Sequence, residues 1–292
     1  MNSSRDMDGC ERFNIDNVYG DICATDKDVC KDRGGKVAVL LPGIGCPNTS
    51  FLEIMRYCRE RTLRCIALNI SGHGDRGINR KSLHTTSVED GVNDVVATVK
   101  WAEEELEAEK LSIFAFSLGA RYEVECLLRR QRERGDGTTG IDKKGFIAPT
   151  LSTLMPSMRV LCNNPVAYAK GLVPFRSDKI MRSAPKLFFD EYDENSDRER
   201  LMHALLPTSA RMYMKTMASG LLIPHASKQI EGPADVLIAK NDRVVRESDS
   251  ANNVGKYFEN DSRIRRFKSS HCGMLHNEEV AEALCKTVLG ES

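Results

Sequence analysis

Three residues of the sequence have the chemistry of a nucleophilic centre, and each of them follows an apolar run. Ser117 lies in FAFSLGARYE, where the apolar stretch LSIFAF gives way to a helical pattern. Asp242 follows VLIAKN, and His271 follows RRFKSS. A serine hydroxyl is a poor nucleophile without a base, and a histidine oriented by a carboxylate can act as that base. The order Ser, Asp, His therefore indicates acyl transfer through a serine.

The residues around Ser117 fit a serine held on a sharp turn between a strand and a helix. Such a turn follows the pattern G-x-S-x-G, and here Ala115 and Gly119 occupy the two glycine positions. Small residues are needed there because larger side chains would collide with neighbouring backbone. A serine after a strand is also a common helix cap, so the pattern gains its weight from Asp242 and His271.

A second histidine, His276, competes with His271 for the role of base. We favour His271 because it follows the predicted strand directly, and because the segment between Asp242 and His271 can hold one helix and one strand. His276 precedes NEE, which is typical of the start of a helix. We therefore expect His276 to have a structural role or to line the pocket.

Strand and helix patterns alternate along most of the chain. Apolar runs typical of buried parallel strands occur at KVAVLLPG, RCIALNI, KLSIFAFS, KGFIAPT and ADVLIAKND, while SRIRRFKSS alternates like an edge strand. The segment FNIDNVYGDICA predicts an opening pair of strands with a turn near Gly20. The alternation predicts an α/β fold with a mostly parallel central sheet and helices on both faces. The three candidate residues follow strand ends, where such sheets place their binding sites.

One long segment, 151–232, interrupts the alternation. It contains several prolines and seven of the eleven methionines. Because a long insertion in a compact fold is usually functional, we interpret this one as a helical lid over the strand ends. The expected organisation is a flexible N-terminus at 1–10, a core formed by 11–150 and 233–292, and the lid between the two parts of the core.

Taken in order, the motifs LLPGIG, LNISGHGDR, FSLGA, AKNDRVV and SSHCGMLH resemble those of the α/β-hydrolase superfamily. The resemblance covers the chain from about Phe13 to Leu289. It implies the α/β-hydrolase fold, with Ser117 as nucleophile, Asp242 as the acid that orients the base, and His271 as the general base. More weakly, SLGAR together with SSH is similar to the fatty-acyl thioesterases of bacterial luminescence and related acyl hydrolases.

The same resemblance implies an oxyanion hole formed by two backbone N–H groups. One belongs to Leu118, and the other comes from the Gly43-Ile44 loop, where we take Ile44 as the donor. The family often has His-Gly where this chain has Pro42-Gly43, and an aspartate is common where Asn69 stands. The position of Asn69 is structural in most members, so we expect this difference to have little effect on catalysis.

The composition argues against several other classes of protein. The 42 basic residues balance the 42 acidic ones, which gives no electrostatic attraction to nucleic acid or anionic lipid. No apolar run approaches the length of an integral membrane segment, and the N-terminus has no apolar signal region. The ten cysteines lack paired spacing, which favours reduced thiols in a cytoplasmic protein. The sequence shows no set of metal ligands, and GHGDRG lacks the helix that a dinucleotide motif requires, so we expect neither metal nor cofactor.

These features predict a serine hydrolase that cleaves an ester or thioester of an apolar acyl group through an acyl-enzyme. Its partner is a small-molecule acyl substrate; the leaving group and the oligomeric state stay open. The alternative is a non-hydrolytic protein of the same fold, either a ligand receptor or a lyase or cyclase that uses the same cavity. The presence of all three candidate residues favours the hydrolase.

Overall fold

A computed structural model describes most of the expected core. The described residues are 10–15, 18–23, 35–43, 46–71, 88–151, 230–258 and 262–291. The expected lid lies almost wholly outside them, because 152–229 is not described.

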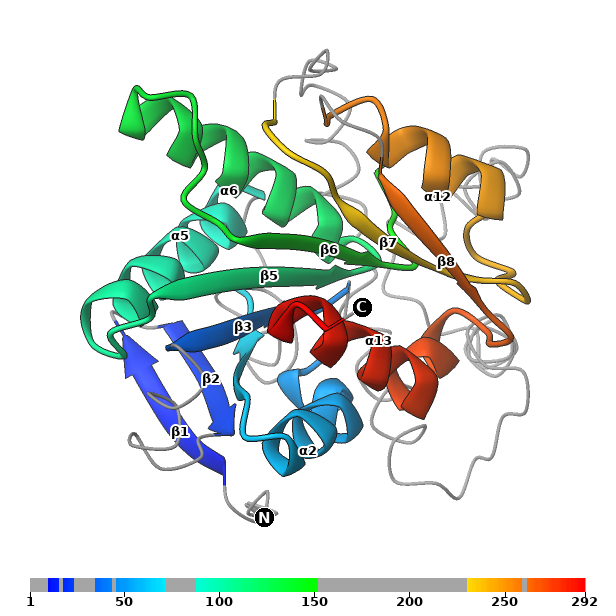
Figure 1. Cartoon of the computed structure of the whole chain (residues 1–292), viewed down its shortest axis with the longest axis horizontal. Coiled ribbons are helices and arrows are strands. Elements are labelled where there is room, and N and C mark those ends of the chain that lie inside the picture. Colours follow the sequence, from blue (N-terminus) through cyan, green and yellow to red (C-terminus); the bar gives the residue numbers. More distant parts are fainter. Residues whose placement is uncertain are drawn as a thin grey trace, which may run out of the picture.

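An eight-stranded sheet forms the centre of the protein (Figure 1), with the strand order β1-β2-β4-β3-β5-β6-β7-β8. The strands from β4 to β8 in this order run parallel to one another, whereas β1 and β2 form an antiparallel pair that adds to β4. The sheet is therefore mostly parallel, as the sequence predicts. The strands are β1 (Cys10–Ile15), β2 (Val18–Cys23), β3 (Lys36–Leu41), β4 (Arg64–Asn69), β5 (Lys110–Phe116), β6 (Lys143–Ile147), β7 (Asp235–Ala239) and β8 (Arg263–Phe267).

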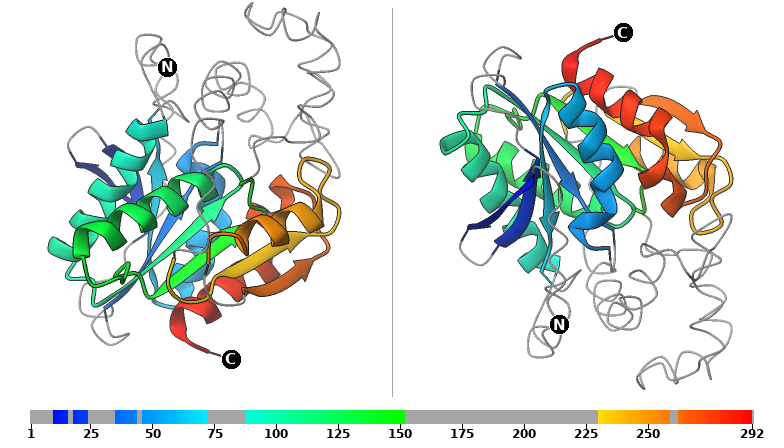
Figure 2. Two further views of the ribbon diagram at one scale, coloured as in Figure 1. Left: turned by 90° about the horizontal axis from the view of Figure 1, so that it is seen from above. Right: turned by 90° about the horizontal axis from the view of Figure 1, so that it is seen from below.

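Helices cover both faces of this sheet (Figure 2). On one face lie α2 and α13, and on the other lie α5, α6 and α12. Two 3-10 helices, η1 and η2, stand before α2 and α13. The bounds are η1 (Asn48–Phe51), α2 (Leu52–Glu60), α5 (Val88–Glu104), α6 (Gly119–Arg134), α12 (Glu247–Val254), η2 (Cys272–His276) and α13 (Glu278–Leu289).

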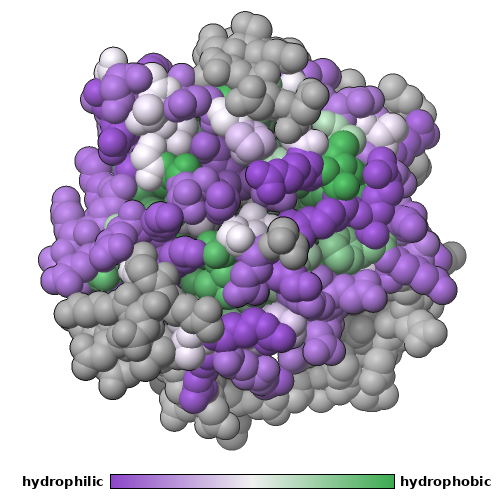
Figure 3. Space-filling model, in the orientation of Figure 1, coloured by the Kyte–Doolittle hydropathy of each residue, from purple (hydrophilic) through white to green (hydrophobic). Residues whose placement is uncertain are grey.

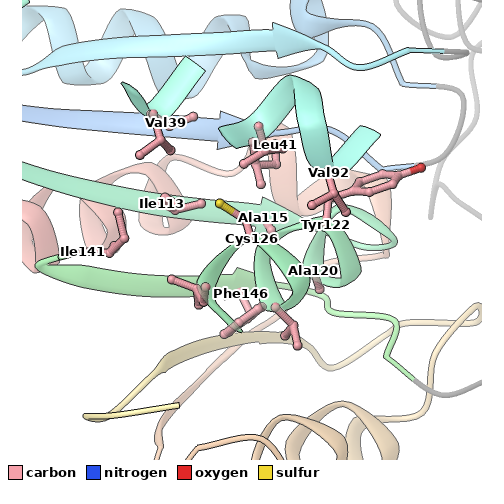
Figure 4. Close-up of a cluster of buried hydrophobic side chains, with 14 of the residues drawn as sticks. Val39, Leu41, Val92, Ile113, Ala115, Ala120, Tyr122, Cys126, Ile141 and Phe146 are labelled. Carbon is pink, nitrogen blue, oxygen red and sulfur yellow. The ribbon is translucent and has the colours of Figure 1, made fainter. Parts of the chain in front are cut away.

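Alternate residues of the central strands supply the two layers of core. In β3, Val39 and Leu41 face the layer of α5 and α6, whereas Leu40 faces the layer of α2 and α13. Figure 4 shows the first layer, in which side chains of β3, β5 and β6 meet Ala120 and Cys126 of α6. Both faces of a central parallel strand are thus buried, which is why these strands appear in the sequence as continuous apolar runs.

One sequence-based expectation about the strands is wrong. Gly20 does not lie at a turn: it stands inside β2, where it pairs with Phe13 of β1 and with Leu68 of β4. The hairpin instead closes between Ile15 and Val18. Glycine is a frequent turn residue, but the pairing register of three strands takes precedence over that local preference here.

The described surface is mainly polar. On the face shown in Figure 3, hydrophilic residues predominate, and the hydrophobic areas are small and separate. Among the described residues, the large apolar side chain that is clearly exposed is Ile264 of β8, at 38%. None of the helices in the described ranges has the length and the apolar character that crossing a membrane requires.

Candidate active site

Ser117 lies on a sharp turn between β5 and α6. Its φ is +51°, in the left-handed region that side chains other than glycine rarely adopt. The turn is held from both sides of the serine, since its N–H donates to the Ile147 carbonyl at 2.9 Å and its own carbonyl accepts from Ala120 N–H at 3.2 Å. A buried, strained serine at the end of a central strand is the geometry that the sequence around it predicts.

Two glycines allow neighbouring backbone to approach this turn. A Cβ on Gly119 would lie 2.7 Å from the carbonyl oxygens of Leu41 and Pro42, at the end of β3. A Cβ on Gly43 would lie 2.9 Å from the Cβ of Ser117. The loop after β3 therefore packs directly against the turn, and a side chain at either position would push the two apart.

The ends of β7 and β8 bring Asp242 and His271 to the same edge of the sheet. Backbone hydrogen bonds continue the pairing beyond the strands, from Lys240 N–H to Phe267 O at 2.9 Å and from Asn241 N–H to Ser269 O at 3.1 Å. Because the two loops stay in register, the residues that follow them lie side by side. Figure 1 shows these strand ends near the end of β5.

The His271 ring connects the other two candidate residues. Its Nδ1 lies 2.7 Å from Asp242 Oδ2, and its Nε2 lies 2.9 Å from Ser117 Oγ. The three side chains are buried; the exposed fraction is 1% for the His271 side chain and 4% for that of Asp242. A carboxylate oxygen only accepts, so Nδ1 carries the proton and Nε2 accepts the hydrogen bond from the serine hydroxyl.

Other contacts fix the orientation of the acid and the ring. Asp242 Oδ1 accepts from the N–H groups of Val244 at 2.7 Å and Val245 at 2.8 Å. This leaves Oδ2 directed at His271. The Phe116 ring packs against the imidazole, with 5.0 Å between the ring centroids. The imidazole is thus held by packing as well as by its two hydrogen bonds.

The comparisons with known proteins agree with this architecture. No protein-family model matches the chain, and no curated protein matches it either. Solved structures do match it over nearly its whole length. A bacterial membrane phospholipase A, described as a virulence factor, superposes with a TM-score of 0.68 and 17% identity, covering 98% of this chain and 88% of its own. Potato (Solanum tuberosum) epoxide hydrolase I superposes with a TM-score of 0.67 and 14% identity, and the match covers 96% of this chain and 99% of the potato enzyme. A Burkholderia cenocepacia protein assigned as an aryl esterase superposes with a TM-score of 0.63 and 15% identity, and the match covers 97% of this chain and 98% of that protein.

The chain has the α/β-hydrolase fold. The turn at Ser117 lies where β5 of this fold meets α6, and the ends of β7 and β8 contribute the other two side chains. Neighbours that share the fold carry different activities in their names, so the fold by itself does not select a reaction. The chemistry has to come from the side chains of this chain.

Of the two residues expected to form the oxyanion hole, Leu118 is described and Ile44 is not. Leu118 follows Ser117 and leads into α6, and among the described residues its N–H has no backbone acceptor. Ile44 lies outside the described residues, although Gly43 before it contacts Ser117. The described part of the α/β-hydrolase fold thus offers one unused backbone donor beside the serine.

The sequence-based reasoning missed Thr150 as a neighbour of the serine. Thr150 Oγ1 lies 3.4 Å from Ser117 Oγ, and Thr150 N–H donates to the Ser117 carbonyl at 2.9 Å. The signal was present in the sequence: Thr150 follows the apolar run of β6, as Asp242 follows that of β7. In this fold all such residues reach the same edge of the sheet.

The two cysteines near the site are buried thiols. Burial raises the pKa of Cys46 to about 12 and that of Cys272 well above its ordinary value. Both therefore stay protonated at neutral pH, and a protonated thiol is not a nucleophile. Within the described residues, no group of histidines, cysteines or carboxylates could hold a metal ion.

Asn69 has a contact expected of a structural residue, and His276 lies at the end of a 3-10 helix. The Asn69 side chain accepts from Asn48 N–H at 2.9 Å and so fixes the start of η1. His276 closes η2, just before Asn277, whose side chain caps α13 by accepting from Glu279 N–H at 2.9 Å. The other histidines of the sequence lie outside the described residues.

Proposed function

We propose that this protein is a serine hydrolase that acts on carboxylic esters or thioesters. The observation that carries the proposal is the His271 ring, which bonds to Ser117 Oγ on one side and to Asp242 Oδ2 on the other. This arrangement provides a nucleophile, a base to remove its proton, and an acid to fix the base. Ser117 is the nucleophile, His271 the general base and Asp242 the orienting acid.

The proposed reaction has two steps. In the first, Ser117 Oγ attacks the acyl carbon, its proton passes to His271 Nε2, and the leaving group takes that proton as the bond to the acyl carbon breaks. In the second, water gives its proton to Nε2 and attacks the acyl-enzyme, and Ser117 Oγ leaves and recovers the proton. Asp242 stabilises the imidazolium that forms in each step.

Backbone donors would stabilise the negative charge on the acyl oxygen. We assign this role to the N–H of Leu118 and, from the loop that Gly43 begins, to that of Ile44. The contact of Gly43 with Ser117 supports the assignment, since it brings the start of this loop to the serine. One such donor typically contributes about a hundredfold or more to the rate.

We further propose that the acyl group is apolar and that 151–232 forms a helical lid that covers it. This segment holds seven of the eleven methionines, whose flexible thioether side chains adapt to irregular apolar ligands. Sites for small molecules are mostly apolar with a few placed polar groups. The six cysteines found as free thiols fit the reducing cytoplasm, where we place the protein in this proposal.

Substitution of the site residues tests the proposed function. We expect Ser117→Ala and His271→Gln each to lower kcat on a 4-nitrophenyl ester by about a thousandfold or more, and Asp242→Asn to have a smaller effect. His276→Gln is the matched control and should keep close to the wild-type rate. Circular dichroism would verify folding. A folded Ser117→Ala protein that retains most of its turnover would exclude Ser117 as the nucleophile.

A series of acyl chain lengths tests the substrate. Burying one methylene is favourable by about 0.8 kcal/mol, so kcat/KM should rise with each added carbon until the pocket is full. The measurement compares 4-nitrophenyl esters and acyl thioesters from acetyl to decanoyl. Highest activity on acetyl would argue against an apolar acyl pocket while leaving the serine mechanism intact.

A further inference from the structure

Thr150 is held rigidly against the serine by the segment that follows β6. Ala148 has a φ of +43°, so it is in the left-handed region, as Ser117 is at the same edge of the sheet. Its N–H bonds to β7 at 2.8 Å, and Ser250 Oγ donates to the Pro149 carbonyl at 3.3 Å. With Thr150 N–H bonded to the Ser117 carbonyl, hydrogen bonds hold the backbone from Ala148 up to the threonine itself. Its side chain therefore has a defined position.

The Thr150 hydroxyl is directed at the reacting atom of the serine. Thr150 is 3% exposed, and Ser117 Oγ, 3.4 Å away, is the hydrogen-bond partner of its hydroxyl among the described residues. Buried hydroxyl groups normally have a partner, because leaving one without a partner is costly. The contact with Ser117 is thus the one that satisfies this hydroxyl within the described part of the chain.

The protons available at the site determine the direction of this hydrogen bond. The Nδ1–H of His271 donates to Asp242, so Nε2 has a free lone pair and accepts the proton of Ser117 Oγ. Ser117 has one hydroxyl proton, and it is already used. Thr150 must therefore donate to Ser117 Oγ, and Ser117 accepts.

We propose that Thr150 is a further catalytic residue, whose hydroxyl stabilises the negative charge that develops on Ser117 Oγ. The inference rests on the proposed role of Ser117 as nucleophile. When Oγ attacks the acyl carbon and its proton moves to Nε2, electron density builds up on Oγ. The same charge builds up when Oγ leaves the acyl-enzyme. Thr150 keeps its own proton in both steps and donates a hydrogen bond.

The length of the contact fits a role in the transition state. A distance of 3.4 Å is long for a bond between two hydroxyl groups, which is usually 2.7–2.8 Å. Bonds from a hydroxyl to a charged oxygen shorten to about 2.5–2.7 Å and become stronger. The interaction is therefore weak in the resting enzyme and strong once charge has formed, which is the condition for raising kcat without lowering KM.

Fluorophosphonate labelling measures this effect independently of the natural substrate. Ser117 Oγ attacks phosphorus, the P–F bond breaks, fluoride leaves with the electron pair, and the proton stays on His271. We expect Thr150→Val, which replaces the hydroxyl by a methyl group, to lower the second-order rate constant of labelling by about tenfold. On 4-nitrophenyl butyrate, kcat and kcat/KM should fall together with KM unchanged.

Matched variants separate the hydroxyl from packing. Thr150→Ser keeps the hydroxyl and should label at close to the wild-type rate, whereas Thr150→Ala should be as slow as Thr150→Val. Thr98→Val is the control for the replacement of a buried threonine by valine. Thr98 is fully buried, and its hydroxyl forms a hydrogen bond within α5. It should leave labelling unchanged. The Ser and Ala variants form a second pair that differs only in the hydroxyl if Thr150→Val does not fold.

The possible results distinguish failure of the Thr150 proposal from failure of the hydrolase proposal. Labelling of the folded Thr150→Val protein at the rate of Thr98→Val would overturn the role of Thr150 and leave the hydrolase proposal intact. Equal rates for Thr150→Ser and Thr150→Ala would overturn it as well. A wild-type protein that does not label at Ser117 and turns over no acyl ester would overturn both.

Discussion

Glu123 is a buried carboxyl group inside α6 that the proposed reaction does not use. It is 0% exposed, and neither of its side-chain oxygens has a hydrogen-bond partner of normal geometry among the described residues. Burial raises its pKa well above the ordinary 4.5, and Lys144 and the backbone of Gly145 act in the opposite direction. The folded protein therefore keeps this proton at a pH at which the unfolded chain has released it.

This difference predicts how stability changes with pH. From about pH 4.5 upward the unfolded chain loses the proton and the folded chain keeps it, so the free energy of unfolding falls by up to about 1.4 kcal/mol per pH unit until the folded pKa is reached. Glu123→Gln removes the titrating group. Its stability advantage over wild type should be small near pH 4.5 and should grow as the pH rises above that value.

Urea unfolding over this range of pH measures the effect. Glu133→Gln, at an exposed position of the same helix, is the control and should follow the wild-type curve. Curves for Glu123→Gln and wild type that stay parallel across the range would show that Glu123 does not keep its proton on folding.

Residues differ in how much of their role the sequence reveals. Asp242 and His271 could be selected because each follows an apolar run, and parallel strands bring such positions to one edge of the sheet. Thr150 follows a run of the same kind, but threonine is common after strands and its type does not indicate chemistry. The surroundings of Glu123 depend on which face of α6 packs against β6. The amino-acid sequence alone does not define how the helix is rotated against the sheet.

Among the elements, the contact between α6 and the end of β3 is the one that the site depends on most. Gly119 begins α6, and the space for its missing Cβ is filled by the carbonyl oxygens of Leu41 and Pro42 at 2.7 Å. Those atoms are backbone at the end of a central strand, so they have little freedom to move. A methyl group at this position must displace either the helix start or the strand end.

We therefore expect Gly119→Ala to lower the free energy of unfolding by about 1–3 kcal/mol, the usual cost of overpacking. Ester turnover should fall as well, because the same displacement moves Ser117 and the N–H of Leu118. Gly255→Ala is the matched control: a Cβ there has no neighbour closer than 3.7 Å, and the backbone of Gly255 is right-handed. If Gly119→Ala leaves both the free energy of unfolding and ester turnover unchanged, the turn at Ser117 can shift without cost.

The elements also show where sequence patterns suffice. The buried strands are predicted by continuous apolar runs, since both faces of β3 and β5 are covered. The hairpin of β1 and β2 was predicted with the wrong turn, because Gly20 is a strand residue whose pairing is set by β4 as well as by β1. The local turn preference of glycine carries no information about pairing with β4.

At the scale of the whole molecule, burial on both faces of the sheet protects the cysteines. Cys58 of α2 and Cys285 of α13 lie with their sulfur atoms 3.0 Å apart in the layer between these helices. Cys65 of β4 belongs to the same layer, and Cys126 of α6 belongs to the opposite one. Burial raises the pKa of Cys58 well above its ordinary value and that of Cys126 to about 12. Access to these thiols therefore requires that the layers separate.

The reactivity of the buried thiols should report global unfolding of the protein. Six of the ten cysteines are described as free and buried, so no more than four should react quickly with 5,5′-dithiobis(2-nitrobenzoate) in the native protein. The thiolate is the reactive form of cysteine, and burial keeps the reagent away from all six thiols. In urea all ten thiols should react. The reaction rate of the six buried thiols should rise in step with the loss of circular dichroism, because these thiols react only in molecules that have unfolded. Peptide mapping identifies the modified residues. Rapid modification of Cys58 or Cys285 under native conditions would mean that α2 and α13 separate without unfolding of the sheet.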